Sequence, residues 1–117
     1  MGFSETDFAS QVEIKVSEHN FSTQVESLLN LYGWTWQHQR PARTKYGWTT
    51  AVSGYKGFPD YCAARKKDGE RQVIFAELKD EKSEPTPEQQ HWLDVTGGYL
   101  WRPSMIEEIM RILREGK

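Results

Sequence analysis

The chain has 117 residues, of which 37% are hydrophobic and 13% aromatic, and its formal net charge is −2. This length is typical of one domain that buries a modest core without disulfides or a structural metal. The charge excludes the strongly basic balance of a protein that coats nucleic acid passively. The single cysteine, Cys62, excludes an internal disulfide and is typical of a reducing compartment.

Two further absences in the sequence concern membranes and export. No apolar run approaches the roughly 20 residues that a helix needs to cross a bilayer. The N-terminus lacks the basic and apolar regions of a signal peptide. We therefore expect a cytoplasmic protein without a membrane partner, in which residues 1–16 are an N-terminal extension of uncertain structure and residues 17–117 form the functional domain.

The first predicted helix begins at Ser17 as its N-cap and ends at Gly33. Its apolar positions repeat with helical spacing at Phe21, Val25, Leu28, Leu29 and Tyr32. Residues 34–38 alternate in the manner of a strand. Residues 40–57 contain Pro, Gly and scattered cations, so we expect a long loop, which in a small domain is usually functional or mobile.

The middle of the chain predicts a β-hairpin. Residues 61–64 and 73–76 are short apolar strands, and the Asp-Gly pair at 68–69 is a hairpin turn. Asp60 precedes the first strand and Glu77 follows the second. Because the strands are antiparallel, these two carboxylates should lie side by side.

The last third predicts a helix, a strand and a helix. Thr86 is a plausible cap for a helix that starts at Pro87, and Gly97-Gly98 ends it. Residues 99–101 form a short strand, and Ser104 is the expected cap of a final amphipathic helix. The predicted fold class is therefore α/β, with a mixed sheet flanked by helices.

The paired carboxylates suggest a metal site. Mg²⁺ prefers oxygen ligands, and one or two carboxylates plus a substrate phosphate are sufficient to bind it. Asp60 and Glu77 supply the carboxylates, and the backbone carbonyl of Leu78 is a possible third ligand. Lys79 shares a strand face with Glu77 and is placed to act on a water. Taken alone, however, the Glu77–Lys79 pair is much more typical of a plain surface ion pair than of a catalytic site.

Four motifs together resemble the VRR-NUC branch of the PD-(D/E)xK nucleases, and stand-alone phage-encoded members most of all. They are Gly57-Phe58-Pro59-Asp60, Phe75-Ala76-Glu77-Leu78-Lys79, Thr86-Pro87-Glu88-Gln89 with Trp92-Leu93, and Trp101-Arg102-Pro103-Ser104. The resemblance implies a restriction-endonuclease-like fold and Mg²⁺- or Mn²⁺-dependent cleavage of DNA. It further implies branched substrates such as Holliday junctions, a homodimer and, for a phage protein, the host cytoplasm.

The resemblance also implies the site residues. The metal-binding aspartate and glutamate fall on Asp60 and Glu77, the lysine on Lys79, and a glutamine on Gln89. The glutamate of the first helix falls on Glu18, as a further metal ligand. Glu26, two turns later on the same helix, is its rival, and Glu18 is also explained as an acid at a helix start.

Cations are dense between residues 40 and 71, where eight Lys or Arg face three acids. The loop residues Arg40, Arg43, Lys45 and Lys56 are possible DNA contacts, and His38 is placed to touch the scissile phosphate. A solvated loop and a strand-end histidine explain the same residues without DNA. A catalytically inactive nucleic-acid-binding module and a protein-interaction module remain alternatives to the predicted metal-dependent endonuclease.

Overall fold

The computed structural model describes residues 18–39, 42–44, 47–49 and 53–117, with side chains described except at 18–19, 42–44 and 47–49. The predicted extension, residues 1–16, lies outside this part. The elements are α2 (Glu18–Leu31), β1 (Thr35–His38), β2 (Ala42–Thr44), β3 (Gly47–Thr49), β4 (Tyr61–Lys67), β5 (Glu70–Leu78), α3 (Pro87–Thr96), β6 (Tyr99–Trp101), a 3₁₀ turn (Pro103–Met105) and α4 (Ile106–Glu115).

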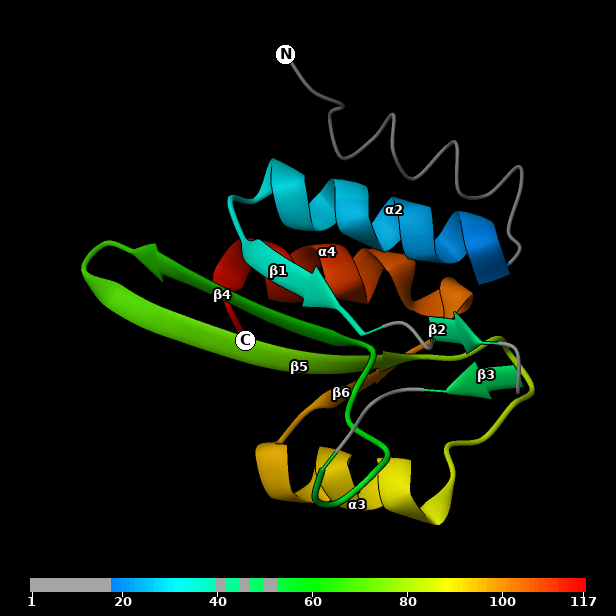
Figure 1. Ribbon diagram of the computed structural model, residues 1–117. Coiled ribbons are helices and arrows are strands. Elements are labelled where there is room, and N and C mark those ends of the chain that lie inside the picture. The colour runs from blue at the N-terminus through cyan, green and yellow to red at the C-terminus, as the bar shows by residue number, and fades with distance from the viewer. Residues whose placement is uncertain (1–17, 40–41, 45–46, 50–52) are drawn as a thin grey trace.

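A four-stranded sheet in the order β1-β4-β5-β6 forms the middle layer. Its first three strands are antiparallel neighbours, and β6 runs parallel to β5. Helices α2 and α4 cover one face and α3 covers part of the other (Figure 1). The expected mixed α/β sheet flanked by helices is therefore confirmed.

The hydrophobic core lies between the sheet and the pair α2 and α4. Helix α4 buries five side chains because its apolar residues recur every three or four positions, on one face. The sheet meets this face with alternate strand residues, among them Ala63 and Ile74. The indole of Trp34, just after α2, donates to the carbonyl of Leu113 at 2.9 Å, so the polar atom of this buried side chain is satisfied.

The β4–β5 hairpin follows the prediction but is longer. Asp68 and Gly69 have φ values of 53° and 79°, as expected for the two central residues of a tight hairpin turn. The strands pair from Lys67 and Glu70 at the turn to Tyr61 and Ala76 at the far end. The register pairs next to the turn, Lys67–Glu70 and Lys66–Arg71, consist of charged residues. The sequence there lacks the apolar alternation that would predict a strand.

Two sequence-based expectations are wrong. The segment 40–57 is not a loop throughout, because β2 and β3 pair antiparallel within it; backbone pairing of two three-residue strands leaves no hydrophobic pattern to detect. Ser104 does not cap α4, whose N-cap position is Met105 without a side-chain cap. The Ser104 hydroxyl donates instead to Glu81 at 3.1 Å.

No helix in the described part of the chain is long and apolar enough to cross a membrane.

Candidate active site

Asp60 and Glu77 lie side by side where the hairpin ends. Asp60 directly precedes β4, and Glu77 is the next-to-last residue of β5. The register pair Tyr61–Ala76 brings them together, as the sequence predicts. Asp60 Oδ2 accepts a hydrogen bond from the backbone N–H of Leu78 at 2.9 Å, so its carboxylate is fixed against β5.

Glu77 is the one buried charged side chain of the described residues, with a relative exposure of 2%. Its Oε2 accepts a hydrogen bond from Gln89 Nε2 at 3.1 Å. The same oxygen lies 3.8 Å from Lys79 Nζ. Lys79 therefore shares the face of Glu77, as strand alternation predicts, but its side chain is 20% exposed. An amide, a cation and a second carboxylate thus surround one buried acid.

Burial raises the pKa of Glu77 from 4.5 to about 8. The second cause is the charge of Asp60, and a hydrogen bond between the two side chains adds to it. Lys79 lowers the pKa and so opposes both. Near neutral pH, therefore, Glu77 holds a proton that a cation beside the two acids would displace.

Helix α3 places Gln89 through its N-terminal cap. The Gln89 N–H donates to the Thr86 hydroxyl at 3.1 Å, and the Thr86 N–H donates to Gln89 Oε1 at 2.9 Å. This is a reciprocal capping box. It fixes the oxygen end of the amide and directs the nitrogen toward Glu77. The Thr-x-x-Gln spacing is visible in the sequence and signals the cap, whereas only the fold reveals its second task.

The loop before Asp60 is pressed against the same helix. Trp92 donates from its indole to the carbonyls of Lys56 at 3.0 Å and Tyr55 at 3.3 Å. Gly57 has a φ of 89°, and a Cβ there would lie 2.8 Å from Glu88 Cβ and 2.9 Å from Gln89 N. Only glycine permits this approach, so the glycine of the Gly57–Asp60 motif locates α3 relative to Asp60.

Arg102 holds the connection between Lys79 and α3. Its guanidinium donates to the carbonyls of Asp80 and Ser83 and lies 3.3 Å from Glu84. Asp80 in turn accepts from the N–H groups of Lys82 and Ser83. Nothing in the sequence indicates this role of Arg102, because two of its three partners are backbone carbonyls, which leave no signature.

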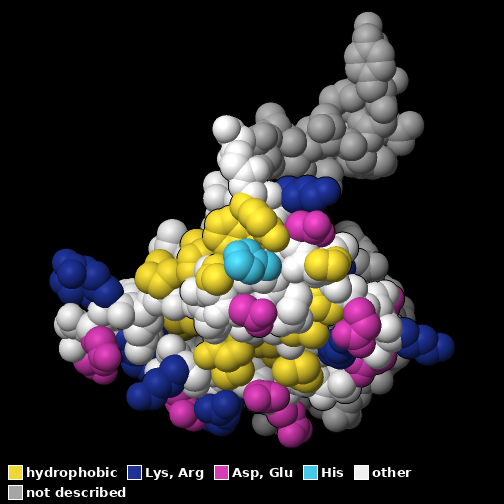
Figure 2. Space-filling model, turned by 90° about the horizontal axis from the view of Figure 1, so that it is seen from below, with side chains coloured by type: hydrophobic (Ala, Val, Ile, Leu, Met, Phe, Trp, Pro, Cys, Tyr) yellow, Lys and Arg dark blue, Asp and Glu magenta, His cyan; other side chains and the backbone are white. Residues whose placement is uncertain are grey.

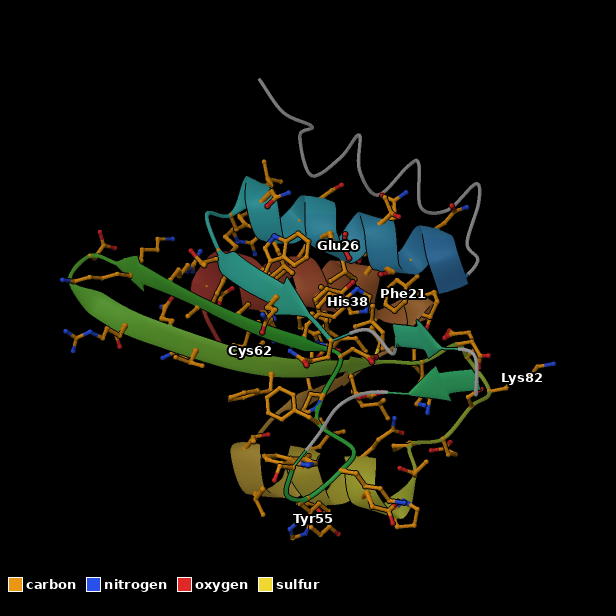
Figure 3. All side chains as sticks on the ribbon, in the orientation of Figure 1. Phe21, Glu26, His38, Tyr55, Cys62 and Lys82 are labelled. Atoms are coloured by element: carbon orange, nitrogen blue, oxygen red, sulfur yellow. The ribbon has the colours of Figure 1, made fainter. Side chains whose placement is uncertain are left out.

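The first helix contributes Glu26 to a second polar cluster beside Asp60. Glu26 Oε2 accepts from the Tyr61 hydroxyl at 2.5 Å and lies 3.3 Å from His38 Nδ1. The imidazole stacks on the Tyr61 ring with centroids 4.2 Å apart, and Figure 3 shows Glu26 and His38 close together between α2 and β1. Burial and the contact with Glu26 raise the pKa of Tyr61, which therefore stays protonated as the donor.

The remaining predicted residues are placed less completely. Glu18 begins α2, but its side chain lies outside the described residues, as do those of Arg40, Arg43 and Lys45. Lys56 is exposed on the loop that Trp92 fixes. His38 lies in the Glu26 cluster, on the helix side of the sheet. The DNA contacts proposed for these residues, and a ligand role for the Leu78 carbonyl, stay predictions.

The donor set fits Mg²⁺ or Mn²⁺, because carboxylate oxygens are the ligands that these ions prefer. Asp60 and Glu77 supply two, and a cation would relieve the repulsion between them. Among the side chains that the structure describes, no three His, Cys, Asp or Glu are grouped closely enough to hold a metal. Water and a substrate phosphate would have to complete the coordination.

Comparison of the chain with protein-family models finds no match, and neither curated proteins nor solved structures match it. The VRR-NUC resemblance therefore depends on the motif residues alone.

A first prediction concerns the loop–helix contact. We expect Gly57→Ala to lower the free energy of unfolding more than Gly54→Ala, as measured by urea denaturation. Both glycines have positive φ, which costs alanine about 1–2 kcal/mol. Of these two glycines, only Gly57 has neighbours within 4 Å of the added carbon. The resulting overpacking costs roughly a further 1–3 kcal/mol. Equal losses in the two variants would contradict the proposed contact.

A second prediction concerns Glu77 without metal. Since folding raises the pKa of Glu77, the folded protein binds this proton more tightly than the unfolded chain, and the contribution of Glu77 to stability is greatest below the pKa of the unfolded chain. We expect the free energy of unfolding in EDTA to fall from pH 4.5 toward pH 8, by about 1.4 kcal/mol for each unit of pKa difference.

Glu77→Gln should remove this slope, because the amide does not titrate. Glu107→Gln, at an exposed position of α4, should retain it. A wild-type slope that survives Glu77→Gln would assign the pH dependence to another group.

Proposed function

We propose that the protein is a divalent-metal-dependent DNA endonuclease of the VRR-NUC type with a restriction-endonuclease-like fold. The observation that carries the proposal is the convergence of three segments on one buried acid. Asp60 lies directly before β4, and Lys79 lies directly after β5 with its ammonium near the Glu77 carboxylate. Gln89, in the first turn of α3, donates a hydrogen bond to Glu77. A plain surface ion pair between Glu77 and Lys79 does not explain why Glu77 is buried beside a second carboxylate.

The residues divide the chemistry among them. Asp60 and Glu77 would hold Mg²⁺ or Mn²⁺, which when bound polarises a phosphoryl oxygen and lowers the pKa of a water. Gln89 fixes the orientation of the Glu77 carboxylate through the 3.1 Å hydrogen bond. Lys79, partly exposed beside that carboxylate, orients the attacking water or stabilises charge on the phosphate.

For the glutamate of the first helix we propose Glu26 rather than Glu18. The Glu26 carboxylate contacts the hydroxyl of Tyr61, the residue that follows Asp60. Glu26 thereby joins α2 to the first residue of β4, directly after the aspartate proposed to bind the metal. From the resemblance we also propose branched DNA as the preferred substrate, a homodimer, and action in the cytoplasm, which is that of the host if a phage encodes the protein.

A third prediction tests the nuclease itself. We expect cleavage of DNA in Mg²⁺ or Mn²⁺, assayed on linear, nicked, flapped and four-way substrates. Asp60→Ala should lower the rate by at least about 10³-fold, because a lost metal ligand removes several kcal/mol of transition-state stabilisation. The matched carboxylate control, Glu107→Gln, should cleave at the wild-type rate.

The outcomes separate the alternatives. Cleavage by Asp60→Ala at the wild-type rate would refute the assignment of the metal site. Salt-dependent DNA binding without cleavage in any metal would favour the inactive nucleic-acid-binding module instead. Binding to a protein partner but not to DNA would favour the interaction module.

A fourth prediction distinguishes the two helix acids. We expect Glu26→Gln to reduce the cleavage rate by about tenfold or more, since supporting contacts of a metal site typically contribute 10–100-fold. Glu18→Gln should leave the rate within about twofold, a change worth only ~0.4 kcal/mol. Thermal denaturation of both variants controls for loss of folding. The reverse ranking would return the role to Glu18.

A further inference from the structure

The tip of the β4–β5 hairpin extends beyond the helices that cover the sheet (Figure 1). Four cations lie at or near this tip, and strand alternation divides them between the two sheet faces. They are Arg65, Lys66, Lys67 and Arg71. None of them belongs to the candidate active site.

Arg65 and Lys67 lie on the sheet face that α2 and α4 cover, and both have structural roles. Arg65 donates to the carbonyls of Tyr32 and Arg114 at 2.8 Å each, and its guanidinium lies 4.5 Å from the centre of the Trp34 ring. Lys67 donates to the Arg114 carbonyl at 3.2 Å. Arg65 therefore joins the hairpin to the residue after α2 and to the end of α4, and Lys67 joins it to α4 alone.

The two cations on the opposite face oppose each other. Lys66 and Arg71 are direct register partners across the strands, and like charges in that position destabilise a sheet. Both are exposed. Among the residues that the structure describes, neither forms an ion pair. The described residues thus provide no carboxylate partner for either cation, and an anion bound between the two would offset their repulsion.

The sheet face that carries Lys66 and Arg71 also carries Glu77 of the candidate active site. Arg71 and Glu77 are six residues apart on one strand, so they share a face and lie roughly 20 Å apart. The strand residues between them on this face are uncharged: Phe75 and Val73 on β5, and Cys62 and Ala64 on β4. Val73 is 58% exposed, so α3 does not cover this end. Figure 2 views the molecule from the α3 side, with Lys and Arg side chains where the hairpin projects.

We propose that Lys66 and Arg71 form a second contact for the phosphate backbone of the DNA whose cleavage occurs at Asp60 and Glu77. This inference rests on the proposed function. The spacing along the strand corresponds to roughly 6 base pairs at 3.4 Å per step. The hairpin thus binds the duplex arm beside the cut and not the scissile phosphate itself.

The experiment compares neighbouring lysines on opposite faces. We measure DNA binding by fluorescence anisotropy in an Asp60→Asn background, which prevents cutting. Lys66→Ala and Arg71→Ala should each weaken binding about fivefold or more near physiological salt. Each should also reduce the slope of log affinity against log salt by about 1. Lys67→Ala removes the same charge one residue away and should leave binding within about twofold, and Lys66→Arg should retain wild-type affinity.

Two further readouts distinguish a DNA contact from a structural role. In cleavage assays of otherwise wild-type protein, Lys66→Ala should raise KM with kcat within about twofold, because the lost contact is remote from the reacting phosphate. Its melting temperature should be equal to or above that of the wild type, since a like-charge pair is removed. The deficit should vanish on DNA whose arm is shorter than about 6 base pairs.

Several results would overturn the inference. If the wild type binds and cuts DNA while Lys66→Ala and Arg71→Ala behave like Lys67→Ala, the hairpin contact is wrong and the proposed function stands. If the wild type neither binds nor cuts DNA, both fail. Loss of a dimer in these variants at unchanged DNA affinity, measured by sedimentation, would assign the face to a second copy of the chain.

Discussion

The burial of one carboxylate, that of Glu77, constrains the whole site. An acid with 2% exposure is stable in a folded protein only if it is protonated, hydrogen-bonded or paired with a cation. The Gln89 amide and the Lys79 ammonium lie around the Glu77 carboxylate. Lys79 lowers the pKa of Glu77, whereas the charge of Asp60 raises it. In our proposal, a divalent cation bound beside Asp60 and Glu77 completes this arrangement by replacing the proton of the buried acid.

The position of α3 follows from that constraint, because the amide that meets Glu77 belongs to its first turn. Gln89 is held by the capping box with Thr86, and the loop at Gly57 packs on the same turn without a side chain between them. Arg102 holds the connection from Lys79 to this helix. One short helix is therefore fixed by three separate contacts, and each of them bears on the distance between Gln89 and Glu77.

The hairpin serves two purposes because its side chains alternate between faces. Toward the helices, Arg65 and Lys67 fasten the strands to the backbone of α4, and Arg65 also to the residue after α2. On the other face, Lys66 and Arg71 oppose each other at a cost in stability. The same period of two places Glu77 on the face of Arg71. In our proposal the strand that carries the catalytic acid also carries its contact with the rest of the DNA.

Elements with strong local signals could be predicted from the amino-acid pattern alone. The turn at 68–69, the helix beginning at Pro87 and the apolar stripe of α4 depend on neighbouring residues, so they were predicted correctly, as was the pairing of Asp60 with Glu77 across one hairpin. Contacts between residues distant in the chain could not be predicted in this way and are visible only in the folded protein. The contact of Glu26 with Tyr61 joins positions 35 residues apart, and Arg102 donates to backbone carbonyls that lie 22 and 19 residues before it. Such contacts arise from packing between elements, which local spacing does not encode.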